Sequence, residues 1–176
     1  MNKLKEYIIN FGNLALGKYE YEFTAGEIFF SHYDYSLVKH GDVKIHLQLD
    51  KESDALIILD FVLDGSLRLE CDTCLDPIDY PLNATDRLIL KLDDRVAGVE
   101  DDEIAFLPAD AYQIDVSPYI YEFINLELPL KSSCSLVGKE CNPNMLQMID
   151  KTNSDENKEE IDPRWEALKK LNGNKK

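Results

Sequence analysis

The sequence predicts an α+β protein with an antiparallel, β-rich body, either a sheet or an open barrel, and a few short helices, one of them at the C-terminal end. Two observations lead to this fold class. Short apolar segments separated by turn residues fill the chain as far as residue 91, and such close spacing favours antiparallel pairing. Beyond residue 116, three dipeptides place a capping residue before proline, and each predicts the start of a helix. They are Ser117-Pro118, Asn142-Pro143 and Asp162-Pro163.

The first part of the chain is predicted to be a series of strands interrupted by one short helix. Residues 18–23 alternate aromatic and charged side chains, and residues 43–49 alternate aliphatic and polar ones. This is the period of a half-buried strand. Residues 25–35 lack the alternation and predict the short helix. The apolar run over residues 56–63 predicts another strand, which we expect to end in a hairpin turn at Asp64-Gly65-Ser66, because Gly and Asp tolerate positive φ.

Strand-like alternation resumes after this turn and leads directly into Cys71. Another strand or two are predicted over residues 80–90, beyond a turn at Asp76-Pro77. Residues 92–103 contain six acidic residues and a single arginine, so we expect an acidic, solvated loop there. Short strands are then expected over residues 104–106 and 112–116.

Changes in composition divide the chain into three parts. Residues 1–149 are predicted to form a single β-rich domain that includes the acidic loop. Residues 150–161 form a charged linker. Residues 162–172 form a C-terminal helix, because apolar side chains recur there at every third position. These side chains are Trp165, Leu168 and Leu171.

The chain has 176 residues and a formal net charge of −15. Such an excess opposes non-specific binding to nucleic-acid phosphates and indicates either solubility alone or a basic protein partner. The N-terminal segment shows no signal-peptide pattern, and no apolar run approaches the roughly 18 residues that cross a bilayer. We therefore expect a cytoplasmic protein without membrane contact, whose cysteines stay reduced.

Four cysteines form two pairs, Cys71 with Cys74 and Cys134 with Cys141. A Cys-x-x-Cys pair places two thiolates on one edge of a tetrahedron, and structural zinc prefers four such ligands, so the four cysteines are candidate zinc ligands. The second pair is looser, with six residues between its members. Four ordinary reduced thiols, some of them buried, are therefore an alternative. A redox dithiol is the third reading, but the acidic residues around the first pair are expected to disfavour thiolate formation without a metal.

The sequence does not predict an enzyme. It contains no Gly-rich phosphate loop and no nucleophile elbow. The three histidines, His32, His40 and His46, do not have the spacing of a metal site and are expected on the surface. A small hydrolase with a carboxylate site is the remaining enzymatic hypothesis. No catalytic residue and no small-molecule substrate are assigned.

The predicted C-terminal helix combines an aromatic residue with basic ones. Arg164, Trp165, Lys169 and Lys170 are candidate partner-binding residues, because Arg and Lys contact phosphates and aromatic rings stack on bases. The alternative is that the apolar stripe of this helix packs on the body, with its lysines near the negative C-terminal end of the helix.

Four segments in a fixed order resemble the YceD family, the large ribosomal RNA subunit accumulation proteins. The segments are residues 65–75, which contain Cys71-Asp72-Thr73-Cys74, and residues 112–122, 128–130 and 162–171. The resemblance covers roughly residues 15–172 and depends on the ordered set rather than on any single motif. Many members carry a denser second cysteine cluster, whereas only Cys134 and Cys141 stand in that region here. The chain therefore looks like a branch with a reduced second cluster.

The resemblance implies a non-enzymatic accessory protein of large-subunit ribosome biogenesis, which supports ribosomal RNA accumulation by binding ribosomal RNA or a ribosomal protein. The acidity of the chain suits a basic ribosomal protein better than naked RNA, because complementary fields steer encounter. The one cofactor expected is a structural zinc ion on the four cysteines. An alternative from another class is a zinc-binding or thiol-based protein-interaction adaptor that uses Cys71 and Cys74.

Overall fold

The computed structural model describes residues 4–93, 100–101 and 104–155. Six strands form the main sheet and two more form a small second sheet. The main-sheet strands are β2 (Gly17–Ala25), β3 (His40–Lys51), β4 (Leu56–Glu70), β5 (Pro77–Leu92), β6 (Glu100–Asp101) and β7 (Ile104–Leu107). The sheet is open, with β2 and β6 at its two ends. The predicted α+β class is confirmed, and of the two forms expected for the body the structure has the sheet.

Long antiparallel strands build most of the main sheet. β2, β3, β4 and β5 pair in chain order, whereas β7 runs parallel to β5. Buried and exposed side chains alternate along most of β3 and β4, because successive residues of a strand point to opposite faces. Leu47, for example, lies opposite Tyr21 on one side and Phe61 on the other. One face of the sheet therefore carries the apolar core and the other is mainly polar.

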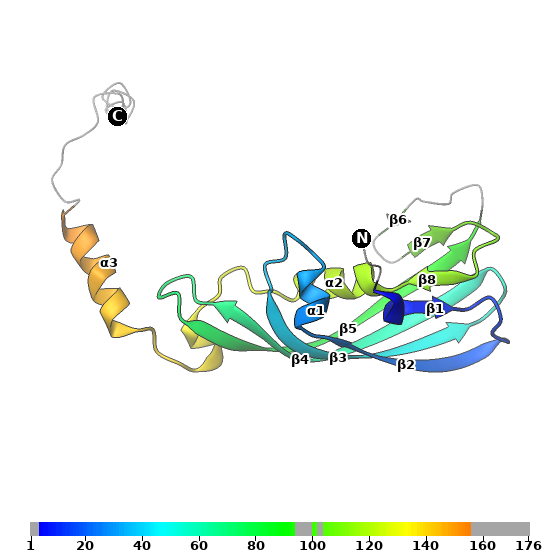
Figure 1. Cartoon of the computed structure of the whole chain (residues 1–176), viewed down its shortest axis with the longest axis horizontal. Helices are drawn as coiled ribbons and strands as arrows, with labels where there is room; N and C mark the ends of the chain where they lie inside the picture. Colours follow the sequence, from blue (N-terminus) through cyan, green and yellow to red (C-terminus); the bar gives the residue numbers. More distant parts are fainter. Residues whose placement is uncertain (1–3, 94–99, 102–103, 156–176) are drawn as a thin grey trace, which may run out of the picture.

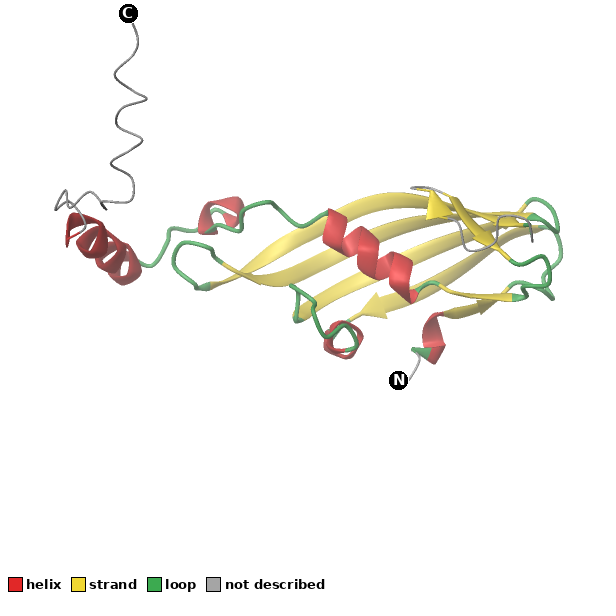
Figure 2. Ribbon diagram, turned by 90° about the horizontal axis from the view of Figure 1, so that it is seen from above, coloured by secondary structure: helices red, strands yellow, loops and turns green. Residues whose placement is uncertain are grey.

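Helices and the small second sheet cover the apolar face. They are β1 (Ile8–Asn10), β8 (Gln113–Asp115), α1 (Glu27–Ser31) and α2 (Ser117–Leu126), with the 3-10 turn η1 (Lys5–Tyr7) before β1. Figures 1 and 2 show these elements on one side of the sheet, with α2 lying across its strands. The ring of Phe123 on α2 meets that of Phe61 on β4 edge to face, with centroids 5.1 Å apart. The core therefore lies between the sheet and this second layer.

The prediction of a hairpin turn at Asp64-Gly65-Ser66 is wrong. β4 continues through these residues to Glu70. Gly65 instead permits a close approach of the neighbouring strand, because a Cβ atom added to it would lie 2.1 Å from the carbonyl oxygen of Asp42 on β3. The glycine is therefore required by strand packing rather than by a turn.

The chain beyond the core contains η2 (Cys134–Val137) and α3 (Pro143–Asp155), which lies beyond one end of the sheet in Figure 1. Helices begin at both Ser117-Pro118 and Asn142-Pro143, as predicted. The capping role expected of Ser117 is wrong, because Ser117 is the first residue of α2 and its hydroxyl donates to Asp115. α3 extends into the segment expected to be a linker. The predicted helix over residues 162–172 lies outside the described residues, as does most of the predicted acidic loop, so the division into three parts stays a prediction. Within the described residues, every helix is too short or too polar to span a bilayer.

Candidate metal centre

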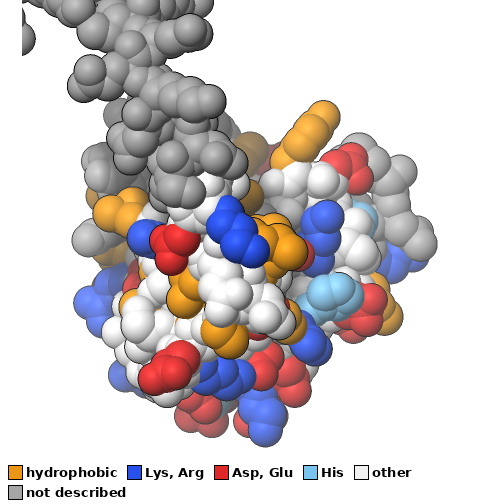
Figure 3. Space-filling view, turned by 90° about the vertical axis from the view of Figure 1, so that its left-hand side faces the viewer, with side chains coloured by type: hydrophobic (Ala, Val, Ile, Leu, Met, Phe, Trp, Pro, Cys, Tyr) orange, Lys and Arg blue, Asp and Glu red, His pale blue; other side chains and the backbone are white. Residues whose placement is uncertain are grey.

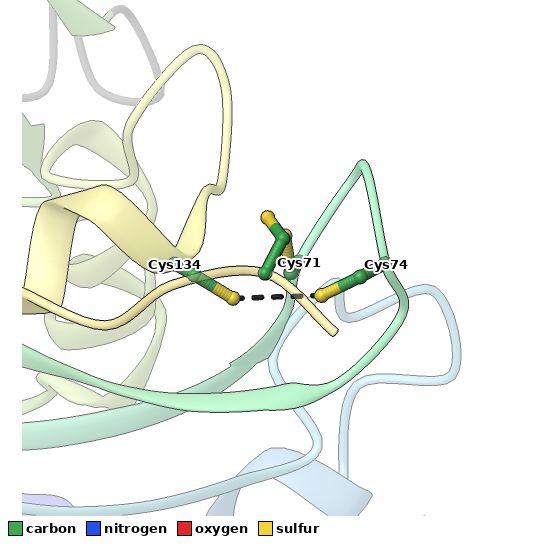
Figure 4. Close-up of side chains that lie close together, drawn as sticks. Cys71, Cys74 and Cys134 are labelled. Atoms are coloured by element: carbon green, nitrogen blue, oxygen red, sulfur yellow. Dashed lines mark hydrogen bonds between the residues drawn. The ribbon is translucent and has the colours of Figure 1, made fainter. Parts of the chain in front are cut away.

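The four cysteines come together at the end of the sheet from which α3 departs. Cys71 and Cys74 lie in the turn between β4 and β5, Cys134 begins η2, and Cys141 lies just before α3. All four sulfur atoms lie within 4.8 Å of one another. Two contacts link the two pairs, with 3.5 Å from Cys74 to Cys134 and 3.8 Å from Cys71 to Cys141. Figure 4 shows Cys74 and Cys134 pointing toward each other.

The turn that carries the first pair is shaped by its own backbone. The amide of Cys71 donates to the carbonyl of Asp76 at 2.9 Å, and the amide of Leu75 donates back to the carbonyl of Cys71 at 2.8 Å. Leu75 has a φ of +63° and is the one residue other than glycine with a positive φ among those described. A leucine in the left-handed region is strained. The strain occurs where the chain curls to bring Cys74 back beside Cys71.

Two hydrogen bonds fasten the second cysteine segment to this turn. The amide of Asp72 donates to the carbonyl of Ser132 at 2.8 Å, and the amide of Ser132 donates to the Asp72 carboxylate at 2.7 Å. Cys134 lies two residues further on. Sequence reasoning treated Asp72 only as an acidic neighbour of the cysteines, and nothing in its spacing to Ser132 indicates this contact. Asp72 is thus a positioning residue that the sequence did not reveal.

A tight turn between Cys134 and Cys141 brings these two cysteines together despite the six residues that separate them. η2 ends at Gly138, whose φ of +68° suits glycine, and the amide of Lys139 donates to the carbonyl of Cys134 at 3.0 Å. The six intervening residues therefore fold back on themselves and return Cys141 toward Cys71. A separation that looks wide in sequence is a short distance in space.

The sulfur cluster is largely shielded from solvent. Cys71, Cys74 and Cys134 are buried, and Cys141 is half-buried. Burial of the thiols, and the other cysteines around them, raises the pKa of Cys134 to about 12. Burial first, and then the Cys71 thiol, raises the pKa of Cys141. Both groups are therefore thiols at neutral pH in the metal-free protein.

The pKa of Cys71 is shifted in the opposite direction to those of Cys134 and Cys141. Hydrogen bonds from the backbone amides of Cys74 and Thr73 lower its pKa to about 6. The expectation that nearby carboxylates disfavour a thiolate is therefore wrong at Cys71, because amides that point at the sulfur act at shorter range than side chains directed to solvent. These hydrogen bonds favour the thiolate form of Cys71, and a metal ion would displace the protons of the other thiols.

The donor set fits a zinc ion. A tetrahedron with zinc–sulfur bonds of about 2.3 Å has sulfur–sulfur edges of about 3.8 Å. The two cross-pair distances, 3.5 and 3.8 Å, match this edge, and the upper limit of 4.8 Å leaves little adjustment to be made. Four cysteine sulfurs around one ion form a closed structural site that keeps no position for water. The arrangement is thus compatible with structural zinc.

The other predicted functional residues lie elsewhere. His32, His40 and His46 are exposed, as expected, and His40 lies 3.7 Å from Glu27. The candidate partner-binding residues Arg164, Trp165, Lys169 and Lys170 lie outside the described residues. Their role stays a prediction.

Comparisons with known proteins agree with the order of motifs. A family model described as large ribosomal RNA subunit accumulation protein YceD matches residues 59–172. An uncharacterized protein of Bacillus subtilis strain 168, YlbN, is 28% identical over 116 residues. That alignment covers 65% of this chain and 66% of the relative, slightly less than two thirds of its length. No solved structure matches the chain. The family match includes all four cysteines.

Proposed function

This chain belongs to the YceD family of large ribosomal RNA subunit accumulation proteins, and from that premise we propose that it is a non-catalytic accessory protein of large-subunit ribosome assembly. It supports the accumulation of ribosomal RNA in the cytoplasm, where ribosomes are built. The observation that carries the proposal is the family match over residues 59–172, which spans the cysteine cluster and the strands that position it.

The chemistry of the cysteine cluster supports a structural role. With four sulfurs within 4.8 Å of one another, a bound zinc ion would have all its positions filled by Cys71, Cys74, Cys134 and Cys141. Zinc supplies a fixed tetrahedral link between segments, and a filled site activates no water. Its effect is to hold the segment that leads to α3 against the turn between β4 and β5.

The partner is ribosomal RNA or a basic ribosomal protein. The net charge of −15 favours the protein, because fields of opposite sign steer encounter. The C-terminal residues Arg164, Trp165, Lys169 and Lys170 supply a local basic and aromatic element, which is the second contact we assign to the partner. In this proposal residues 1–149 form the body, and residues 150–161 connect it to a C-terminal helix over residues 162–172.

A deletion strain tests this function. We expect loss of the gene to lower the ratio of large-subunit to small-subunit ribosomal RNA, and to reduce the amount of large subunits in a sucrose gradient. Re-expression of the full chain restores both. Unchanged ribosomal RNA levels and an unchanged subunit profile in the deletion strain would refute the proposal.

A second candidate is a thiol-based or zinc-binding adaptor unrelated to ribosomes. The observation that favours it is Cys71, whose pKa is lowered to about 6, because the thiolate is the form that reacts in thiol–disulfide exchange. The two functions differ in their readouts. Normal ribosomal RNA in the deletion strain, together with either bound zinc or thiols that react with a disulfide reagent faster than free cysteine does, supports the adaptor; protein that holds no zinc and has unreactive thiols excludes it.

A further inference from the structure

Several leucines are strongly exposed to solvent. Leu37 is 81% exposed, Leu130 is fully exposed, and Leu126 and Leu75 are exposed by 70% and 62%. Figure 3, which looks at the end of the molecule that holds the cysteines, shows hydrophobic side chains at several places with charged ones between them. Single exposed leucines need no explanation, but a group of them marks a surface that contacts another molecule.

Leu37 and Leu130 line the same hollow. Its volume is about 500 Å³, and we call it the leucine groove. One wall is the segment Leu37–His40, the other is the segment Leu128–Leu130, and the end of β4 at Arg68–Glu70 lies between them. A groove with a fully exposed leucine on its wall offers apolar surface that folding leaves unburied.

Both walls of the leucine groove are held in place. The ring of Tyr33, four residues before Leu37, stacks on that of Tyr121 of α2 with centroids 3.8 Å apart. On the other wall, Ser132 is fastened to Asp72 by the two backbone-anchored hydrogen bonds described above. These contacts fix backbone segments beside both walls of the groove.

Charges of both signs lie among the apolar residues of the groove. Lys39, His40 and Arg68 line the groove together with Glu70 and Asp72. The lining is thus mixed, with leucines on both walls and balanced charges between them, which suits a protein partner, whereas a surface for nucleic acid is dominated by cations and polar donors. The chain as a whole carries −15, so a basic partner is the one whose field complements it.

We propose that the leucine groove is the docking site for a basic protein that carries apolar side chains on its contact face, with Leu37 and Leu130 as the anchoring residues. This inference rests on the proposed function, because it names a ribosomal protein rather than ribosomal RNA as the direct contact of the body. The two leucines enter the apolar face of the partner. The acidic residues of the chain accelerate the approach and orient it.

Binding experiments use the full chain against separately purified basic proteins of the large subunit, and against large-subunit ribosomal RNA. The double variant Leu37→Asp/Leu130→Asp is compared with the wild type. Leu16→Asp is the matched control, because Leu16 is 63% exposed and lies next to β2 rather than on the groove. We expect one or more of the proteins to bind the wild type and the control equally, and the double variant at least tenfold more weakly. All three chains keep the same circular dichroism spectrum and Tm.

Two results overturn the inference. One is equal affinity of the wild type and the double variant for every protein that binds. The other is binding to RNA alone, with affinity that falls steeply with salt, as phosphate contacts require. Loss of RNA binding in Lys39→Glu/Arg68→Glu, with the leucine variant unaffected, would then locate a nucleic-acid surface instead.

Complementation separates this inference from the proposed function. The proposed function and the docking site are both supported if three results are found together: the deletion strain loses ribosomal RNA, the control Leu16→Asp restores it, and the double variant does not. If the double variant restores it as fully as the wild type, the docking site is refuted while the function stands. If deletion leaves ribosomal RNA unchanged, the function fails, and the binding affinities alone decide the docking site.

Discussion

Cys134 and Cys74 are 60 residues apart in sequence but in contact in the cluster. Substitution of Cys134 therefore tests whether both cysteine pairs bind the same metal ion. We expect wild-type protein to hold about one zinc ion per chain. Cys134→Ser should lose most of it, because a hydroxyl replaces a thiolate ligand, and its Tm should fall. The control is Ser135→Ala, an exposed neighbour on the same turn. Zinc content by elemental analysis and Tm by calorimetry check this. Equal zinc in all three proteins would contradict the metal site.

Tyr7 gives a prediction for alkaline pH. Burial raises its pKa to about 12, with Glu6 adding to the effect, and its hydroxyl donates to the carbonyl of Thr24 at 2.8 Å. An unfolded tyrosine titrates near pH 10. The contribution of the neutral phenol is therefore complete below pH 10 and is lost as the pH rises from 10 to 12.

The substitution Tyr7→Phe should remove this pH dependence and, at neutral pH, lower the free energy of unfolding by about 1 kcal/mol through the lost hydrogen bond. Urea unfolding at pH 7 and at pH 11 measures both effects. Tyr112→Phe is the control, because Tyr112 is 61% exposed. If Tyr7→Phe is as sensitive to alkaline pH as the wild type, the assignment to Tyr7 is wrong.

At the scale of elements, the pairing of β3 with β4 depends on the absence of a side chain at position 65. A Cβ atom there would lie 2.1 Å from the Asp42 carbonyl oxygen and 2.7 Å from the Cα of Val43. These are backbone atoms that cannot rotate away, so the strands must separate. We expect Gly65→Ala to lower the free energy of unfolding by about 2 kcal/mol or more.

The matched control is Gly26→Ala, since nothing lies within 4 Å of a Cβ atom at Gly26. Gly26 precedes α1 as its N-cap, with extended backbone that alanine can adopt, so the control should change stability by less than about 1 kcal/mol. Chemical denaturation compares the two variants. Similar, small effects of both would mean that the β3 backbone yields to the added methyl group.

Strand periodicity predicted most of the sheet, because a strand with one buried face alternates its side chains. β2 and β3 follow this alternation. The failure at Gly65 has a physical reason, since close approach of a neighbouring backbone and a turn both demand glycine and cannot be told apart from local sequence. β5 also contains a proline, Pro81. β4 alone pairs with β5 at that point, and an edge tolerates a proline that a central position would not.

The cysteine cluster was predicted as a set of residues but not as a geometry. The Cys-x-x-Cys spacing by itself indicates that Cys71 and Cys74 lie side by side, and this does not depend on the rest of the fold. The meeting of Cys141 with Cys71 depends on Gly138 reversing the chain and on the clamp between Asp72 and Ser132. Contacts between residues sixty positions apart leave no periodic trace in a single sequence, so the leucine groove could not have been foreseen either.

For the molecule as a whole, the net charge of −15 is a source of self-repulsion that salt should relieve. Raising NaCl from 10 mM to 1 M shortens the Debye length from about 30 Å to about 3 Å. We expect the Tm to rise by several degrees over this range. The double variant Glu20→Lys/Glu22→Lys, on the exposed face of β2, reduces the negative charge by four units and should respond less. A Tm that is flat or falls with salt in the wild type would contradict this.

The distance in sequence between the two cysteine pairs also determines when the cluster can form during translation. Cys134 lies 60 residues after Cys74. At a synthesis rate of about 5–20 residues per second, it is therefore added roughly 3–12 s later. Throughout that interval the nascent chain presents only the first two thiols, while β4 and β5 are already able to pair. If the four cysteines bind zinc, the complete site forms only late in biosynthesis. A cell short of zinc should accumulate chains whose sheet is complete and whose cysteine end stays open.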